Sequence, residues 1–302
     1  MKTNIIVFAY NRLDHIKQVI DILYKLNTRK FYFVCDGPKN IDDIKKTLLV
    51  KKIIKNKKFK NCKYLFFNKN IGVRNIFKKG LDWVFKFEKK IIIIEDDIIP
   101  SISFFKFCDK LLIKYQKNKK ISQISGNNVY DKITKNNKDS YLFSKYSNIW
   151  GWATWKDRWL DYDIFFKNLK KFNNQDGLKK ISISKNEKKY WQKYFNLHSA
   201  NKEYGTWDFA WTFTNFFHQR VSIMPKVNLV KNIGFDNGTG VNPSKLSNLK
   251  NLEIDFPLTH PKSIEANKDY DKYCSANIYS IPPLKWRIKN KLKKLFLFKN
   301  NI

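Results

Sequence analysis

The first 125 residues alternate between two hydrophobic periodicities, and this alternation constrains the fold more than any other feature. Short runs of consecutive apolar residues, typical of strands that are buried on both faces, are separated by amphipathic helical segments. The predicted strands are Ile5–Ala9, Phe31–Cys35, Tyr64–Phe67 and Ile91–Ile94. Strands that alternate with helices in this way form parallel βαβ units. We therefore predict an α/β fold with a mostly parallel sheet flanked by helices.

Polar residues follow each of these strands. In a parallel sheet the carboxyl ends of the strands lie at one edge, and ligands bind there. Four polar segments should therefore meet at this edge: Tyr10–Arg12, Asp36–Gly37, Asn68–Arg74 and Glu95–Asp97.

The most informative of these segments is the acidic triplet Glu95, Asp96 and Asp97, which directly follows four isoleucines. Adjacent carboxylates at the end of a buried strand are unfavourable unless their charge is compensated. Oxygen ligands suit Mg²⁺ or Mn²⁺, which could neutralise the charge that develops on a departing nucleoside diphosphate. The alternative is that the acids only end the strand and cap the next helix. We favour a metal site at this triplet, because three other polar segments should lie opposite.

Arg12 and Arg74 stand out in a chain that mostly uses lysine. Their planar guanidinium groups suit a diphosphate, and so does the amino terminus of a helix predicted to begin at Gly72. A solvated arginine on a helix is the alternative for each. Asp36 could bind the imide of uracil or a ribose hydroxyl, or it could only form the turn before Gly37.

Asp208 lies among aromatic residues in the segment Gly205–Trp211. A carboxyl group in a partly apolar pocket can have the raised proton affinity that a general base needs, although Asp208 could also cap a helix that begins at Phe209. His260 is a second candidate ligand for the metal or the diphosphate. An ordinary loop histidine is the alternative.

Beyond residue 125 the alternation is lost and aromatic residues become dense. Flat rings at the mouth of a cleft would stack on sugars, so we predict that Trp150, Trp152 and Trp207 contact an acceptor. Core packing between the two halves of the chain is the competing interpretation.

The 302 residues include 60 Lys+Arg and 26 Asp+Glu, which gives a formal net charge of +34. This excess suggests an anionic partner such as nucleic acid, an acidic membrane face or a phosphorylated substrate, but a general bias towards Lys, Asn and Ile explains it equally well. The four cysteines form no CxxC pair, which argues against a zinc site and suits a reducing compartment. No apolar run approaches the roughly 18 residues that cross a bilayer. We expect a cytoplasmic protein, either free or peripheral on the inner membrane face.

The order and spacing of these segments resemble the GT-A glycosyltransferases, which have a Rossmann-like fold. The chain is most similar to the N-acetylglucosaminyltransferase I family and to bacterial glycosyltransferases from surface-polysaccharide loci. The matching segments, within about residues 4–115, are Val7–Arg12, Val34–Gly37, Asn68–Gly72, Ile93–Asp97 and Phe104–Phe107. Three further segments resemble the bacterial members only: Trp150–Trp155, Asn228–Gly234 and Pro257–Pro261.

The resemblance implies a metal-dependent hexosyl- or N-acetylhexosaminyltransferase that uses a UDP-sugar donor. It implies that Asp97 holds Mn²⁺ or Mg²⁺ and that Asp208 deprotonates the acceptor hydroxyl in an inverting displacement. The acceptor would be a saccharide or a lipid-linked molecule in surface polysaccharide or glycan synthesis. We assign the donor site to Ala9, Tyr10, Asn11, Arg12, Asp36, Asn70, Gly72, Arg74, Glu95 and Asp96.

These assignments divide the chain into three regions. Residues 1–125 form the nucleotide-sugar-binding half, and residues 126–281 form the aromatic-rich, acceptor-binding and catalytic half of the same domain. Residues 282–302 form a basic amphipathic tail that could lie on anionic lipid, with a solvated terminus as the alternative.

Two other classes of protein stay open. A sugar-phosphate nucleotidyltransferase could use the same scaffold, but no Gly-rich, basic loop that would hold a triphosphate lies near the amino terminus. A non-enzymatic nucleic-acid-binding protein is suggested by the charge and the aromatic residues, but it gives no reason for three acids at the end of a core strand. We therefore expect no nucleic-acid partner.

Overall fold

The computed structural model describes residues 2–130, 138–201, 205–235 and 249–281. Its centre is an eight-stranded sheet with the order β3-β2-β1-β4-β8-β6-β9-β7. The strands are β1 (Ile5–Ala9), β2 (Phe31–Cys35), β3 (Cys62–Phe66), β4 (Lys90–Glu95), β6 (Ile121–Ser125), β7 (Tyr141–Ser144), β8 (Trp152–Trp155) and β9 (Val221–Pro225). A separate two-stranded sheet pairs β5 (Ile98–Pro100) with β10 (Val230–Asn232).

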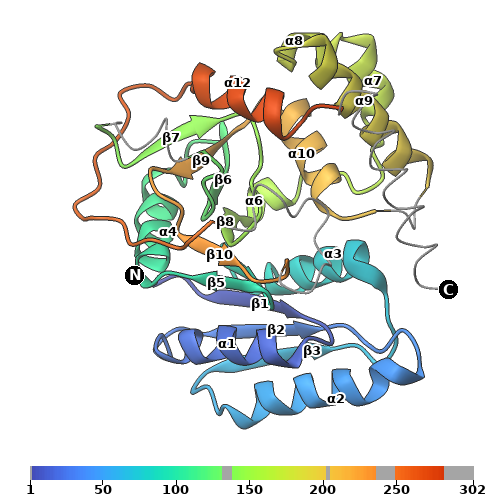
Figure 1. Cartoon of the computed structure of the whole chain (residues 1–302), viewed down its shortest axis with the longest axis vertical. Helices are drawn as coiled ribbons and strands as arrows, with labels where there is room; N and C mark the ends of the chain where they lie inside the picture. Colours follow the sequence, from blue (N-terminus) through green and yellow to red (C-terminus); the bar gives the residue numbers. More distant parts are fainter. Residues whose placement is uncertain (1, 131–137, 202–204, 236–248, 282–302) are drawn as a thin grey trace, which may run out of the picture.

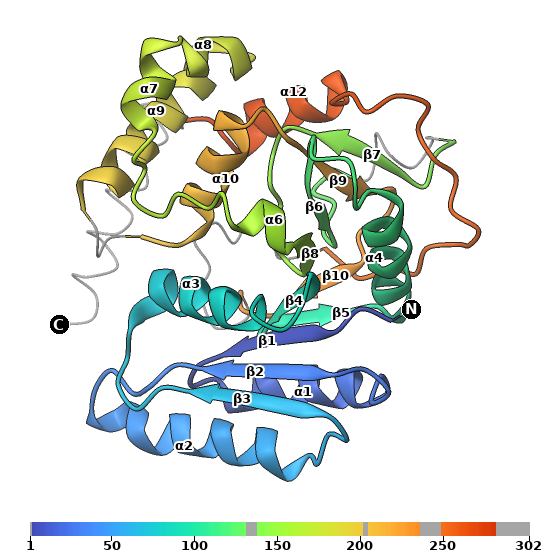
Figure 2. The ribbon, with the colours of Figure 1, turned by 180° about the vertical axis from the view of Figure 1, so that it is seen from behind.

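Helices lie on both faces of the large sheet (Figures 1 and 2). The described helices are α1 (Leu13–Tyr24), α2 (Ile41–Asn56), α3 (Gly72–Val84), α4 (Ile102–Lys114), α6 (Lys156–Trp159), α7 (Leu169–Asn174), α8 (Gly177–Ile181), α9 (Lys185–Ala200), α10 (Asp208–Phe217) and α12 (Lys268–Asn277). Among the described residues, none of the helices has both the length and the apolar character that a membrane span requires.

The sheet is mostly parallel, as predicted. Strands β3, β2, β1 and β4 all pair in parallel, and β6 pairs in parallel with β9. Only β8 and β7 run against their neighbours, so six of the eight strands point in one direction. The α/β prediction is therefore confirmed.

The order of the first four strands creates a crevice. The chain moves outward from β1 through β2 to β3, and then returns to the other side of β1 to form β4. The connections that leave β1 and β4 therefore diverge. In open α/β sheets, ligands bind at such a switch point, beyond the carboxyl ends of the strands.

Alternating side chains of β1 supply the two hydrophobic cores. Ile5 and Val7 pack in the core that α1, α2 and α4 cover. Ile6 and Phe8 point to the opposite face and pack with α3 and α10. Burial on both faces explains why these strands are continuous apolar runs in the sequence.

Three strands of the large sheet, β7, β8 and β9, come from the described part of the region beyond residue 125, where the sequence shows no simple alternation. The segment Trp150–Trp155, interpreted above as the rim of a cleft, contains β8. All four residues of β8 are buried, and the strand pairs with β4 and β6 inside the sheet. The predicted basic tail, residues 282–302, and its contact with lipid lie outside the described residues.

Candidate functional site

A cavity of about 340 Å³ lies at the switch point between β1 and β4. Residues from all four predicted polar segments contribute to its wall, so the predicted convergence of these segments is confirmed. The lining residues are Phe8, Ala9, Tyr10, Arg12, Asp36, Lys39, Asn70, Gly72, Val73, Ile76, Phe77, Glu95 and Asp96.

Arg12 joins two of the three acids at one end of the cavity. Its Nη2 atom lies 3.2 Å from Oδ1 of Asp96, and its Nη1 atom lies 2.8 Å from Oδ2 of Asp97. The second carboxylate oxygen of Asp96 accepts a hydrogen bond of 3.0 Å from the backbone amide of Tyr10. These contacts tie the end of β1 to the turn after β4 and supply one positive charge to three adjacent acids.

One arginine does not fully compensate these acids. Burial raises the pKa of Asp96 to about 7 in spite of the opposing effect of Arg12, and the charge of Asp97 adds to the increase. Burial also raises the pKa of Glu95 well above its usual range, and the charges of Asp97 and Asp96 contribute further. A second cation near these side chains would therefore favour their charged forms.

Asp97 is the acid best placed to bind that cation. Its side chain is 14% exposed, and its contact with Arg12 uses the Oδ2 atom. Within the described ranges, no group of three or more His, Cys, Asp or Glu side chains is arranged to hold a metal ion. Mg²⁺ is often bound by one or two carboxylates together with substrate phosphates and water, so a partly exposed Asp97 beside undercompensated acids fits a site that substrate completes.

Gly234 is a site residue that the sequence interpretation did not single out. The backbone amide of Ile233 donates a hydrogen bond of 2.9 Å to the backbone carbonyl of Asp97. A Cβ atom on Gly234 would lie 2.3 Å from Oδ2 of Asp97 and 3.0 Å from Nη1 of Arg12. Any side chain here would displace the Asp97–Arg12 pair. The only signal in the sequence is that this glycine ends the segment Asn228–Gly234.

Asp36 forms the wall of the cavity near α3. Its carboxylate accepts backbone amide hydrogens from Gly37 at 2.8 Å, Ile71 at 3.0 Å and Gly72 at 3.1 Å. The side-chain amide of Asn70 donates to the carbonyl oxygen of Gly37 at 3.1 Å. Asp36 therefore has the turn-forming role considered above and also caps α3. Burial raises the pKa of Asp36, and the three amide hydrogen bonds oppose the increase.

Tyr10 and Asn11 are directed toward α2. The hydroxyl of Tyr10 and the side-chain amide of Asn11 both donate hydrogen bonds to the carboxylate of Asp43, with a distance of 2.7 Å for Asn11. Tyr10 still contributes to the wall of the cavity, as does Ala9, whereas Asn11 is absent from the wall.

The remaining wall is apolar. The rings of Phe8 and Phe77 stack with their centroids 4.1 Å apart, and Ile76 and the partly exposed Val73 lie on the same side of the cavity. The cavity thus combines an apolar surface suited to a flat ring with a charged end suited to a diphosphate.

Arg74 is not at this site, in contrast to the sequence-based assignment. Its buried guanidinium donates to the backbone carbonyl oxygens of His198 and Asn201, both at 3.2 Å, and of Ile164. Arg74 therefore connects α3 to the second half of the chain, because those carbonyl groups need donors at a buried position.

Asp208 is the first residue of α10, and its carboxylate accepts a hydrogen bond from the hydroxyl of Thr206. Burial raises the pKa of Asp208. The charge of Asp208 in turn contributes to the raised pKa of Glu95, so the two carboxylates are within electrostatic range of each other. The side chain thus combines a position at a helix start with the raised proton affinity expected of a general base.

Two of the three predicted acceptor contacts are core residues. Trp152 is fully buried and Trp207 is 2% exposed. The indole of Trp207 stacks on Trp152 at 5.3 Å and on Phe77 at 4.4 Å. These faces are used in packing, so they do not form an open stacking surface for sugar, and the alternative of core packing is correct. Trp150 is partly accessible, and its ring lies 5.3 Å from that of Phe235.

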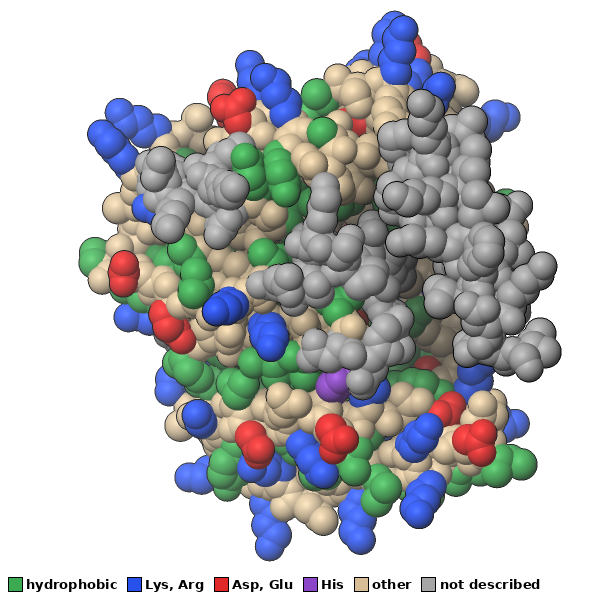
Figure 3. Space-filling view, in the orientation of Figure 1, with side chains coloured by type: hydrophobic (Ala, Val, Ile, Leu, Met, Phe, Trp, Pro, Cys, Tyr) green, Lys and Arg blue, Asp and Glu red, His purple; other side chains and the backbone are tan. Residues whose placement is uncertain are grey.

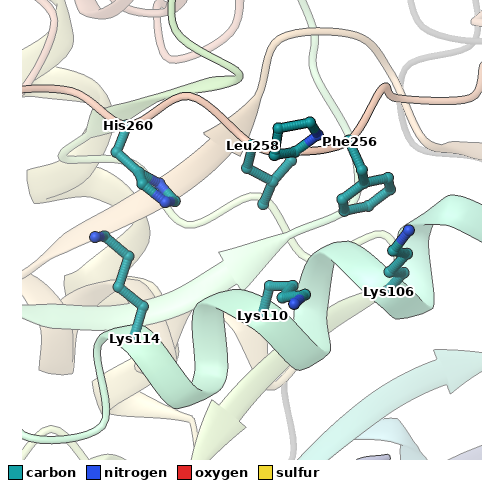
Figure 4. A pocket seen from close by; sticks show the side chains of 7 residues that line it. Lys106, Lys110, Lys114, Phe256, Leu258 and His260 are labelled. Carbon is teal, nitrogen blue, oxygen red and sulfur yellow. The ribbon is translucent and has the colours of Figure 1, made fainter.

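His260 lies in a different pocket from Asp97, so its assignment as a metal ligand is not supported. Figure 4 shows His260 opposite three lysines of α4, in a pocket of about 480 Å³. Its Nδ1 atom is 2.9 Å from the hydroxyl oxygen of Tyr141. Because α4 begins just after the acidic turn and His260 faces Lys114 at the far end of this helix, the histidine cannot reach Asp97.

Comparisons with known proteins give only distant similarity. No protein-family profile and no curated protein matches the chain. Among solved structures, the chain is similar to the mannosyltransferase PcManGT from Pyrobaculum calidifontis in complex with GDP-Man and Mn²⁺, with 10% sequence identity and a TM-score of 0.38. The match covers 52% of this chain and 46% of that one. At this level of similarity, function has to be inferred from the site itself.

Proposed function

We propose that the chain is a metal-dependent glycosyltransferase that moves a sugar from a nucleotide-sugar to a saccharide or a lipid-linked acceptor. The observation that carries this proposal is the cavity at the switch point, where an apolar wall meets three acids and an arginine. A nucleobase fits the apolar side, and a diphosphate fits the charged end. A UDP-sugar is the favoured donor, with Asp36 beside the base.

The side chains at the charged end of the cavity have different roles in this proposal. Arg12 binds the diphosphate through its planar guanidinium, and Asp97 supplies a carboxylate to Mn²⁺ or Mg²⁺. The metal, when bound, neutralises negative charge on the departing nucleoside diphosphate. Glu95 and Asp96 line the cavity. In this proposal, Asp96 lies beside the ribose or the sugar of the donor.

Asp208 is the proposed general base. Its raised pKa favours proton uptake from an acceptor hydroxyl, and its electrostatic range includes Glu95. Attack by that hydroxyl opposite the leaving diphosphate inverts the configuration at the sugar. The acceptor side of the site would include Trp150, which is partly accessible.

The first test is a thermal-shift screen of UDP-, GDP-, CMP- and dTDP-sugars with and without Mn²⁺. A ligand at 100 times its Kd raises the stability of the folded state by about 2.7 kcal/mol, so a true donor gives a clear shift that depends on the metal. The nucleotide-sugar with the largest shift identifies the donor. If none of the four shifts the transition with Mn²⁺, the donor-site proposal is wrong.

The second test uses variants of the two key carboxylates. We expect Asp97→Ala to abolish both the metal-dependent shift and donor hydrolysis, and Asp208→Asn to retain the shift but lose transfer. Asp14→Ala is the matched control, because this acid is 90% exposed on α1 and should leave both readouts unchanged. Unchanged turnover in Asp97→Ala would eliminate the metal assignment. Pyrophosphate release from a sugar phosphate and UTP would instead identify a nucleotidyltransferase.

A further inference from the structure

The outer face of α2 carries large aliphatic side chains that solvent reaches. Ile41 is 84% exposed and Leu48 is 59% exposed, and Ile44 and Leu49 are also open to solvent. The other side of the helix packs on the sheet through Val50 and further buried residues. A surface helix normally has one apolar side, whereas α2 has two.

The exposed aliphatic residues form one stripe together with lysines. At about 100° per residue, Ile41, Ile44 and Leu48 lie within roughly 60° of the helix circumference, and Lys45 and Lys52 directly continue this arc. Figure 3 shows basic, hydrophobic and some acidic side chains intermingled along the edge of the molecule where α1 and α2 lie. We call the stripe of these five residues the α2 face.

The lysines of the α2 face form no ion pair with an acid of the described chain, although the exposed Asp42 lies three residues before Lys45 on the same helix. None of the ion pairs between described residues includes Lys45 or Lys52. The nearest acid in sequence on the inner side, Asp43, accepts hydrogen bonds from Tyr10 and Asn11. The face therefore combines available positive charge with exposed aliphatic surface.

We propose that the α2 face binds the surface of an anionic lipid bilayer. Helices that lie in a bilayer interface use this combination, because their aliphatic side chains enter the boundary between headgroups and acyl chains while lysines contact lipid phosphates. In a symmetric pair of chains, the same lysines would face each other, which disfavours a second copy as the occupant. A nucleic acid or an acidic polysaccharide would leave the aliphatic side chains without a partner.

The position of α2 links this surface to the candidate active site. Asp43, in the first turn of α2, is hydrogen bonded to Tyr10, and Lys39, just before the helix, lines the cavity. In a chain bound through the α2 face, the helix that contacts lipid therefore also adjoins the wall of this cavity, and a lipid-linked acceptor would be presented on the same element. This consequence rests on the proposed function, whereas binding to the bilayer does not.

Flotation with lipid vesicles tests the proposal on the full chain without any donor. Vesicles of phosphatidylcholine are compared with vesicles that also contain phosphatidylglycerol, and we expect at least about tenfold stronger binding to the anionic vesicles. The double variant Ile41→Asn and Leu48→Asn keeps the charge of the chain and should reduce this binding about tenfold. Undiminished binding of this variant would overturn the proposal, since charge alone would then account for the interaction.

A matched pair of charge variants locates the surface. Lys45→Glu with Lys52→Glu changes the α2 face, and Lys110→Glu with Lys114→Glu makes the same change in charge on the exposed side of α4. We expect about a tenfold loss for the first pair and less than about a threefold loss for the second. Equal losses of vesicle binding in the two pairs would refute the proposal that binding is specific to the α2 face. Analytical ultracentrifugation adds a separate check, because a dimer that only the α2 variants dissociate would assign the face to a second copy instead. Because no donor is present, failure here is independent of failure of the proposed glycosyl transfer.

Discussion

The two halves of the molecule place their polar side chains differently. In the first half, strands β1 and β2 are apolar throughout, and β4 has four buried isoleucines between Lys90 and Glu95. The polar residues of this half lie at the carboxyl ends of these strands. In the second half, polar side chains are enclosed in the sheet itself: Gln123 is fully buried and accepts a hydrogen bond from the indole of Trp211 at 2.5 Å. Polar residues thus concentrate at the carboxyl edge of the sheet, around the cavity, in one half and support core packing in the other.

The difference shows that residue type alone does not reveal function. Arg12 and Arg74 were equivalent candidates for binding a diphosphate, but only Arg12 lines the cavity, whereas Arg74 binds backbone carbonyls of the second half. The tryptophans show the same contrast, because Trp152 and Trp207 are buried while Trp150 is partly accessible.

The largest expected effect concerns the tryptophan core of the second half. Trp152→Ala should lower the free energy of unfolding by about 4 kcal/mol, because it removes a fully buried indole and leaves a cavity beside Trp207 and Trp211. Trp150→Ala is the control in the same segment and should cost about 1 kcal/mol or less. Urea unfolding measures both. Equal losses would mean that the two positions do not differ in packing.

The next largest effect distinguishes the structural role of Arg74 from the proposed donor-binding role of Arg12. Arg74→Met should lower the free energy of unfolding by about 3 kcal/mol, because the buried carbonyl groups of Ile164 and His198 and the carbonyl group of Asn201 lose this donor. It should leave the Kd of the donor within about twofold. Arg12→Met should instead weaken donor binding at least about tenfold, since a charge-assisted contact with diphosphate is lost. Calorimetric titration measures the Kd of the donor for both variants, and urea unfolding measures their stability. Loss of donor affinity in Arg74→Met would show that Arg74 does contribute to donor binding.

The smallest expected effect is a change in the free energy of unfolding with pH, caused by Asp271 in the second half of the chain. Burial raises the pKa of Asp271 from 3.8 to about 6, and its carboxylate accepts a hydrogen bond from Ser144 at 2.5 Å. Between pH 4 and pH 6 the folded state therefore holds a proton that the unfolded chain has released, so stability falls as the pH rises through this range.

Asp271→Asn should remove this component, which amounts to about 2 kcal/mol between pH 4 and pH 7. Urea unfolding at the two pH values measures the change, and the exposed Asp14→Asn in the first half is the control. If wild type and Asp271→Asn show the same change in stability with pH, Asp271 is not the group that titrates.

The fold of the first half could be predicted from the sequence because β1, β2 and most of β4 are buried on both faces and the strands are separated by regular helices. The boundaries of β1 and β2 agree with the predicted Ile5–Ala9 and Phe31–Cys35. The convergence of the polar segments followed from the rule for parallel sheets, and the Arg12–Asp97 contact at 2.8 Å is one result of that convergence.

The other site assignments could not be predicted, because they depend on contacts between residues that are distant in the sequence. No periodicity indicates that Arg74 contacts carbonyl groups 90 to 127 residues later, or that Trp207 packs between Trp152 and Phe77. Likewise, His260 is adjacent to Tyr141 only because of the tertiary fold. The aromatic density of residues 140–220 fits both a cleft and a core, and tertiary packing decided between them for Trp152 and Trp207.

Gly234 lies so close to Asp97 that the geometry of the acidic turn depends on a second segment, more than 130 residues later in the sequence. Strand β5 continues from this turn and pairs with β10, and the amide of Ile233 is bonded to the carbonyl of Asp97 itself. A fragment that ended after the first four strands would keep the apolar wall around Phe8 but would lack the clamp that positions the carboxylate. Transplanting residues 1–125 alone into another protein would therefore carry over Arg12 and the three acids without the contacts from Ile233 and Gly234 that position Asp97.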